Sequence, residues 1–437
     1  MLENENSQYF SKSVNHNIPQ YYYPYPLSNS STNASNIQNN SVYNSNITFY
    51  IDFSTGQKYI FNDNQYNSFE LTLNKFLKEK KLENYKNKIK CVLCDANKVD
   101  FSKTLIDNNI KQNCHVLCYI DDSNNTNNIE DIYGKGFRYY ARVSKAGCDF
   151  KGNVKINQDT TIVYVSVGNI KGFNLFGVLD GHGSHGHYVS EFCRNHFIKE
   201  MNLYANKCKT ENICTPEEIY FQLKTTNFDF IKDCFQDADD QMSKQNIFEY
   251  NMSGTTCNLV IQLNKYLICA NVGDSRSILV YDNDTQTNQG LINLSIDHIP
   301  NLPHEYQRII KNGGMIGKYK YQNGGMDDRL RIFKPGQKFP GISLSRTLGD
   351  FMAKDCGVIT EPDILEYKLT HKSKYLLICS DGVWKHLTNQ DVRNLGEKYF
   401  QKGEIVPHCT LLVKKAVQEW KKVNMIRDDI TIVCVYF

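Results

Sequence analysis

Aspartates that follow apolar, strand-like runs are the feature that most constrains this chain. The run 176–179 leads into Asp180-Gly-His-Gly, and the run 376–379 leads, after Ser380, into Asp381-Gly-Val-Trp. A strand fixes the position of an Asp at its end, and a following Gly lets the backbone approach a ligand closely. One Asp-Gly alone usually marks a turn. Several of them, from distant parts of one chain, indicate a shared site.

Three further acids stand beside apolar runs. Asp274 follows one such run, whereas Asp159 and Asp428 each shortly precede one. Carboxylates that are brought together repel each other unless cations lie among them. Because carboxylate oxygens prefer hard ions, Mg²⁺ or Mn²⁺ is the expected partner.

Residues 138–437 have the pattern of one mixed domain. Strand-like runs alternate with segments in which apolar residues recur at helical spacing. This mixture predicts an α+β fold of two mainly antiparallel sheets with helices outside them. The expected strands are 161–165, 173–179, 256–263, 266–272, 277–281, 375–379 and 430–437, and the expected helices are 188–205, 389–400 and 407–422.

Short motifs follow one another across this domain in a fixed order. They are Asn157-Gln-Asp, Asp180-Gly-His-Gly, Ser253-Gly-Thr-Thr, Ala270-Asn-Val-Gly-Asp-Ser-Arg, Leu344-Ser-Arg-Thr-Leu-Gly-Asp, Glu361-Pro, Ser380-Asp-Gly-Val-Trp and Asp428-Asp-Ile-Thr. In this order they resemble the type 2C (PPM) family of metal-dependent serine/threonine protein phosphatases. The resemblance implies a four-layer α/β/β/α sandwich with a dinuclear metal centre in the cleft between the sheets. It also implies hydrolysis of phosphoserine and phosphothreonine, with a metal-bridging water as the nucleophile.

The resemblance assigns roles to individual metal ligands. Asp180 matches the catalytic carboxylate that bridges both ions, and the backbone carbonyl of Gly181 matches a ligand of one ion. Asp381 and Asp428 match ligands of the other ion. Asp159 matches an acid that supports the second ion, directly or through water.

Other motif residues have less direct roles. His182 matches the catalytic residue proposed to protonate the leaving oxygen of the substrate. Trp384 is expected to pack in the core, and Arg346 and Asp350 are expected to fix loops or form structural ion pairs. The resemblance gives no role to the neighbouring histidines, His185 and His187, which we expect at a loop or helix start.

The sequence departs from the family pattern around Asp159. Gln158 stands where many members have Glu, and Val154 stands where an arginine usually grips the substrate phosphate. Lys155 or Lys151 could supply a point charge there, without the bidentate fork of arginine. Lys155 is therefore the predicted phosphate-binding residue.

A third departure concerns a weaker third metal site. In family members, that site is held by the acid that Asp274 matches and by a second acid. This chain has Lys385 at the position of the second acid. The lysine would repel a cation or partly replace its charge, which predicts a weak or absent third ion. The polar, Gly-rich segment 317–341 is expected to form a flap beside the active site, where it would influence substrate choice.

The N-terminal third of the chain has a different character. Residues 1–46 are rich in Asn, Ser and Tyr and are expected to be disordered. Residues 47–121 show strands, one helical pattern and a stretch, 101–110, that resembles the ubiquitin-like β-grasp fold. Another small α+β domain is the alternative. Such a domain would serve as a docking module, and the polar segment 122–137 would be a linker.

The composition limits the classes of binding partner that are expected. The net charge of +3 gives no sign of nucleic-acid or membrane binding. The chain lacks a recognisable signal sequence, and its 15 cysteines lie mostly in apolar runs, so a cytoplasmic or nuclear location is expected. Phosphoproteins are the expected substrates of a monomeric enzyme. The alternatives are a catalytically inactive scaffold of the same fold, and an adaptor whose main role lies in its N-terminal module.

Overall fold

The computed structural model describes residues 46–53, 58–83, 86, 89–94, 97–98, 100–105, 108, 115–120, 137–282, 290–320, 326–423 and 426–437. Apart from residues 46 and 137, the predicted tail (1–46) and linker (122–137) lie outside these residues. Within the described part of the chain, every helix is too short or too polar to cross a membrane.

The described residues between 46 and 120 contain a five-stranded mixed sheet of order β2-β1-β5-β3-β4 and the helix α1. β1 pairs with β5 in parallel, and the other pairs are antiparallel. Apolar residues of α1 at helical spacing, such as Phe69, Leu73 and Phe76, are buried. The elements are β1 Asn46–Phe53, β2 Lys58–Asn64, α1 Phe69–Glu79, β3 Ile89–Cys94, β4 Asn97–Lys98 and β5 His115–Ile120.

Two antiparallel sheets form the centre of the C-terminal domain. The first has the order β17-β9-β8-β10-β11-β18, with β7 paired to β8, and the second has the order β13-β12-β19-β20-β6. The first comprises β7 Asp159–Tyr164, β8 Phe173–His182, β9 Gly254–Thr255, β10 Cys257–Leu263, β11 Tyr266–Val272, β17 Leu348–Gly349 and β18 Asp363–Lys368. The second comprises β6 Tyr139–Lys145, β12 Arg276–Tyr281, β13 Leu291–Asn293, β19 Ser373–Cys379 and β20 Ile430–Tyr436.

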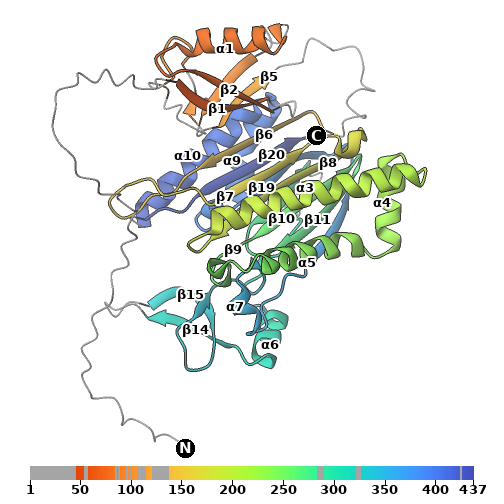
Figure 1. Ribbon diagram of the computed structural model, residues 1–437, viewed down its shortest axis with the longest axis vertical. Coiled ribbons are helices and arrows are strands. Elements are labelled where there is room, and N and C mark those ends of the chain that lie inside the picture. The colour runs from red at the N-terminus through yellow and green to blue at the C-terminus, as the bar shows by residue number, and fades with distance from the viewer. Residues whose placement is uncertain are drawn as a thin grey trace, which may run out of the picture. The chain divides into compact units, whose positions relative to one another are not determined.

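Helices cover the outer faces of both sheets. Figure 1 shows α3 and α5 on one side of the sandwich and α9 and α10 on the other. Apolar residues from the inner faces, among them Phe176 and Val433, form a separate core between the sheets. The predicted α+β sandwich with antiparallel sheets is therefore confirmed. The helices are α3 Gly186–Thr210, α4 Pro216–Thr225, α5 Asp229–Lys244, α8 Asp381–Trp384, α9 Asn389–Gln401 and α10 Ile405–Val423.

A small antiparallel sheet lies where the flap was predicted. It has the order β14-β15-β16 and is called the flap sheet below. Its strands are β14 Met315–Lys320, β15 Met326–Phe333 and β16 Pro340–Ile342, flanked by α6 Pro303–Lys311 and α7 Phe351–Lys354. The sequence pattern did not predict α4, α5 or α6.

A buried ion cluster ties α6 to the loop before β17. Glu305 of α6 is fully buried and accepts hydrogen bonds from Arg346 Nε at 2.9 Å and Arg308 Nη1 at 3.0 Å. Arg346 also donates to Asp363 Oδ1 at 2.8 Å, which confirms its predicted role as a structural ion-pair residue. Burial alone would raise the pKa of Glu305, but hydrogen bonds from Arg308 and Arg346 hold that pKa well below its usual value.

Glu305→Gln should destabilise the domain by about 3–5 kcal/mol at pH 7, because it leaves a buried guanidinium without its counter-charge. The pKa of Glu305 is lower in the folded chain than in the unfolded chain, where it is roughly 4.3. The ionised carboxylate therefore stabilises the folded state at pH values above about 4.3, and this contribution is lost as the pH falls. The difference from wild type should therefore shrink between about pH 5 and pH 3. Urea unfolding across this range measures it.

Asp355→Asn is the matched control for that charge removal. Asp355 is exposed and pairs with Lys334 at 2.8 Å, so its loss should cost less than about 1 kcal/mol. Equal costs for the two variants would contradict a special role for the buried cluster.

Candidate active site

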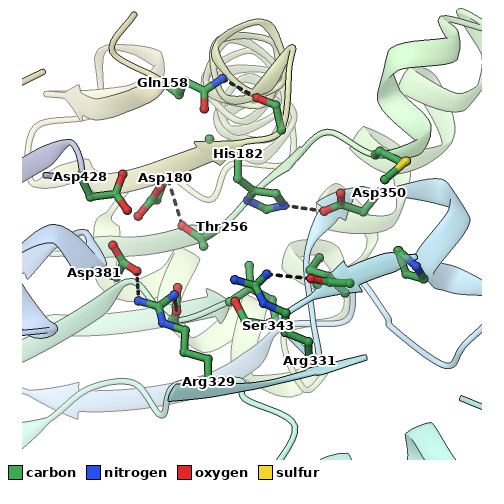
Figure 2. Close-up of a pocket in the computed structure, with 18 residues that line it drawn as sticks. Gln158, Asp180, His182, Thr256, Arg329, Arg331, Ser343, Asp350, Asp381 and Asp428 are labelled. Carbon is green, nitrogen blue, oxygen red and sulfur yellow. Dashed lines mark hydrogen bonds and ion pairs between the residues drawn. The ribbon is translucent and has the colours of Figure 1, made fainter. Parts of the chain in front are cut away.

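A cavity of about 330 Å³ opens at one end of the sandwich and collects most of the predicted site residues. Figure 2 shows Asp180, Asp381 and Asp428 around its centre, with the flap sheet contributing arginines from one side. The lining includes Gln158, Asp180, Gly181, His182, Thr256, Asp274, Arg329, Arg331, Asp350, Asp381 and Asp428.

Two acids face each other across neighbouring strands. Asp159 of β7 is directly opposite Asp180 of β8 in the antiparallel ladder. Directly opposite side chains lie on one face of a sheet, and like charges there are destabilising. Both carboxylate oxygens of Asp159 are buried without a hydrogen-bond partner among the described residues. Asp159 does not itself line the cavity. Burial and the charge of Asp429 raise the pKa of Asp159 well above its usual value, and the hydroxyls of Thr431 and Ser380 offset part of that rise. A cation beside the facing pair would relieve the repulsion between them.

The second sheet supplies two more acids. Asp381 follows the end of β19, and Asp428 shortly precedes β20, its antiparallel neighbour. Asp381 Oδ1 is also buried without a partner among the described residues. Asp274 enters from the end of β11. The donor set is therefore made of oxygens, which suits Mg²⁺ or Mn²⁺.

The electrostatics of these acids point the same way. Burial raises the pKa of Asp180 well above its usual value, and the charges of Asp159, Asp381 and Asp428 raise it further. Burial and Asp381 raise the pKa of Asp274 to about 7. Such carboxylates favour the protonated form unless cations offset their charge.

Gly181 is required by a close approach of backbone segments. A Cβ at this position would lie 2.4 Å from the carbonyl oxygen of Gly186 and 2.5 Å from that of Gln158. Only a glycine lets β8 pass between these two backbone segments. Asp180 and His182 are its neighbours in the sequence, so the close approach also places them at the cavity.

His182 is held by an acid from a distant motif. Its Nε2 lies 2.6 Å from Asp350 Oδ2, and Asp350 also accepts from Thr347 Oγ1 at 3.0 Å. Burial lowers the pKa of His182, but the charge and hydrogen bond of Asp350 outweigh it, so this pKa is raised above its usual value. Asp350 was predicted to fix a loop, and its contact with His182 goes beyond that prediction.

Gln158 has a hydrogen bond that a glutamate would lack. Its Nε2 donates to the carbonyl of Gly183 at 2.8 Å, on the turn after His182. Its own backbone N–H donates to Asp429 Oδ2 at 2.8 Å. The neutral amide therefore fixes the turn beside the cavity.

The cations of the cavity come from the flap sheet. Val154 has an exposed fraction of 74%, and Lys155 is exposed and absent from the cavity lining. Of the described residues that line the cavity, Arg329 and Arg331 carry the guanidinium groups. They alternate on β15 and so share one face of the strand. Neither arginine was predicted from the sequence, although the Arg-x-Arg alternation in the flap segment is a visible signal.

The remaining motif residues pack around the site. His185 immediately precedes α3 and His187 lies in its first turn, as predicted for helix-start residues. Trp384 is buried and donates from Nε1 to the carbonyl of Cys379 at 2.9 Å, which confirms its core role. Lys385 Nζ lies 4.9 Å from the centre of the Trp420 ring.

Comparisons with known proteins agree with this geometry. The family model for protein phosphatase 2C matches residues 146–419. A probable protein phosphatase 2C 72 from Arabidopsis thaliana is 31% identical over 300 residues, which cover 66% of this chain and 84% of that protein. A crystal structure of serine-threonine phosphatase 2C from Toxoplasma gondii has a TM-score of 0.57 at 21% identity, covering 68% of this chain and 94% of that one.

The chain belongs to the protein phosphatase 2C family, whose members are metal-dependent serine/threonine protein phosphatases. The likeness to the Toxoplasma structure independently supports the fold.

Asp180→Asn should have opposite effects on stability with and without metal. In EDTA, the variant should be more stable than wild type by on the order of 1 kcal/mol, because folding no longer requires the Asp180 carboxyl to take up a proton or to bear a repelling charge. With Mn²⁺ at about 100 times its Kd, wild type should gain about 2.7 kcal/mol and the variant much less. Chemical unfolding in EDTA and in Mn²⁺ measures both effects.

Asp240→Asn is the control, since Asp240 is exposed on α5 and absent from the cavity lining. It should respond to Mn²⁺ as wild type does. A destabilised Asp180→Asn protein in EDTA would mean that the carboxylate has a structural role and not a ligand role.

Proposed function

We propose that this phosphatase acts on phosphoserine and phosphothreonine in proteins, with two Mg²⁺ or Mn²⁺ ions held by acids of the cavity and by Asp159 beside them. The observation that carries the proposal is the facing pair Asp159 and Asp180, whose charges need a cation. Bound divalent ions would supply an activated water and offset charge on the phosphoryl oxygens.

The ligands divide between the two sheets. On the first sheet, Asp180 would bridge both ions, the Gly181 carbonyl would bind one, and Asp159 would support the other. Beside the second sheet, Asp381 at the start of α8 and Asp428 just before β20 would complete the set. Because each acid lies on a strand or next to the end of one, binding would require little reorganisation of the backbone.

His182 is the proposed general acid. A serine or threonine alkoxide is a poor leaving group and needs a proton as the bond to phosphorus breaks. Asp350 holds the His182 ring by a 2.6 Å contact and favours its protonated form. Because Asp350 engages Nε2, the proton would be delivered from Nδ1 while the acids of the cavity stay ionised around their ions.

The flap sheet and the N-terminal domain are the proposed determinants of substrate choice. The flap sheet borders the cavity through Arg329, Arg331 and Pro340. We propose that the N-terminal domain is a ubiquitin-like β-grasp module that docks a protein partner. Its sheet order, β2-β1-β5-β3-β4 with β1 parallel to β5, supports this proposal. A more peripheral phosphate contact by Lys155 and a cytoplasmic or nuclear location stay predictions.

An inactive scaffold is the less favoured function. A fold kept only for binding would have no use for buried carboxylates that repel each other, such as Asp180 and Asp381. Their retention favours an enzyme.

Hydrolysis of a phosphothreonine peptide by the full chain tests the enzyme directly. Turnover should require Mn²⁺ or Mg²⁺, cease in EDTA and be lost in Asp180→Asn, because the bridging ligand has gone. Phosphate release measures it, with Asp240→Asn as the active control. A folded wild-type protein without turnover at millimolar metal would favour the scaffold.

His182→Gln separates proton donation from metal binding. Turnover of the phosphothreonine peptide should fall by roughly 10²–10⁴-fold, the usual contribution of a general acid. Turnover of p-nitrophenyl phosphate should fall far less, because p-nitrophenolate leaves without a proton. Steady-state kinetics with both substrates measure the difference. Equal losses on both substrates would assign His182 to the metal site instead.

A further inference from the structure

Arg329 of the flap sheet reaches into the acid cluster. Its Nη2 donates to Asp381 Oδ2 at 2.7 Å, and its Nη1 lies 3.9 Å from Asp274 Oδ2. Figure 2 shows the guanidinium pointing from β15 toward Asp381. The Arg329 side chain is 32% exposed, and both acids are more deeply buried, so this contact is only partly screened by water.

The contact leaves Asp381 able to bind an ion. Arg329 engages Oδ2 of Asp381, whereas Oδ1 is buried without a partner among the described residues. The two oxygens can therefore serve different cations, with Arg329 fixing the orientation of the carboxylate.

Arg329 also lies where the two acids most need a positive charge. Asp274 and Asp381 raise each other's energy when both are ionised. A guanidinium stays charged throughout the physiological range, and its planar fork can face two carboxylates at once. The nearby Lys385 lines the adjoining cavity, but its ammonium lies over the Trp420 ring. The flap, and not Lys385, thus brings the compensating charge to Asp274.

We propose that Arg329 is the built-in cation of the Asp274–Asp381 pair, where it takes the place of a further divalent ion and latches the flap sheet to the metal centre. The proposal rests on the proposed function, in which Asp381 is a ligand of the dinuclear site. Its consequence is that the position of the flap and the charge of the metal site are coupled, because one side chain serves both.

Counting the Mn²⁺ ions bound to the full chain tests whether Arg329 takes the place of a further ion. Wild type and Asp274→Asn should bind the same number of Mn²⁺ ions in equilibrium dialysis at millimolar Mn²⁺. Arg329→Gln should bind one more, because the exposed acid pair then recruits an ion, and Arg329→Gln with Asp274→Asn should return to the wild-type number. Arg331→Gln is the matched control, since Arg331 lies on the same strand face and lines the same cavity.

Two results would overturn the proposal that Arg329 takes the place of a further ion. One is an unchanged count in Arg329→Gln, and the other is a lower count in Asp274→Asn than in wild type. A wild-type protein that binds no Mn²⁺ would instead refute the proposed dinuclear site, so the two failures are distinguishable.

Hydrogen exchange tests the latch separately. In EDTA, the backbone amides of β15 should exchange several-fold faster in Arg329→Gln than in wild type. Arg329→Lys, which keeps a charge without the fork, should restore part of the protection. Equal exchange in Arg329→Gln and wild type would overturn the latch.

Discussion

Repulsion between buried carboxylates is the constraint on which the rest of this structure depends. Asp159 and Asp180 face each other across β7 and β8, and Asp381 and Asp428 approach from the second sheet. Such a cluster destabilises the folded chain unless cations join it. The sandwich holds the acids in place, and bound metal ions, together with the flap arginine, would supply the charge that offsets their repulsion.

Much of the fold and of the acid cluster could be predicted from the sequence. Asp180, Asp381 and Asp428 stand at the ends of strongly apolar strands, where local pattern and site position coincide. The helices α4 and α5 were not predicted, although the buried residues of α5 include Ile231, Cys234, Phe235, Ala238 and Met242, which recur at helical spacing. For α5 the signal was present in the sequence. The position of Asp350 against His182 was not predictable, since 168 residues separate them and only the fold brings them together.

In the flap, the sequence predicts the segment but not which of its side chains reach the cavity. The segment was recognised as polar and Gly-rich, yet its contribution to the site depends on side-chain direction. Arg329 and Arg331 share a strand face, but which acid each meets is set by how the flap sheet lies over the cavity. Lys155 was predicted as the phosphate contact because it adjoins Val154, which occupies the position of the family's arginine. That assignment stays a prediction, and the guanidinium groups that line the cavity come from the flap sheet, far along the chain.

The register of β7 against β8 has a consequence for how the protein acquires its metal. Asp159 meets Asp180 only in the observed pairing, because a slip of one residue would turn Asp159 to the other face of the sheet. If the pair holds a metal ion, a chain in a shifted register would lack the facing acids and would bind the ion more weakly. Metal would then selectively stabilise the correctly paired sheet.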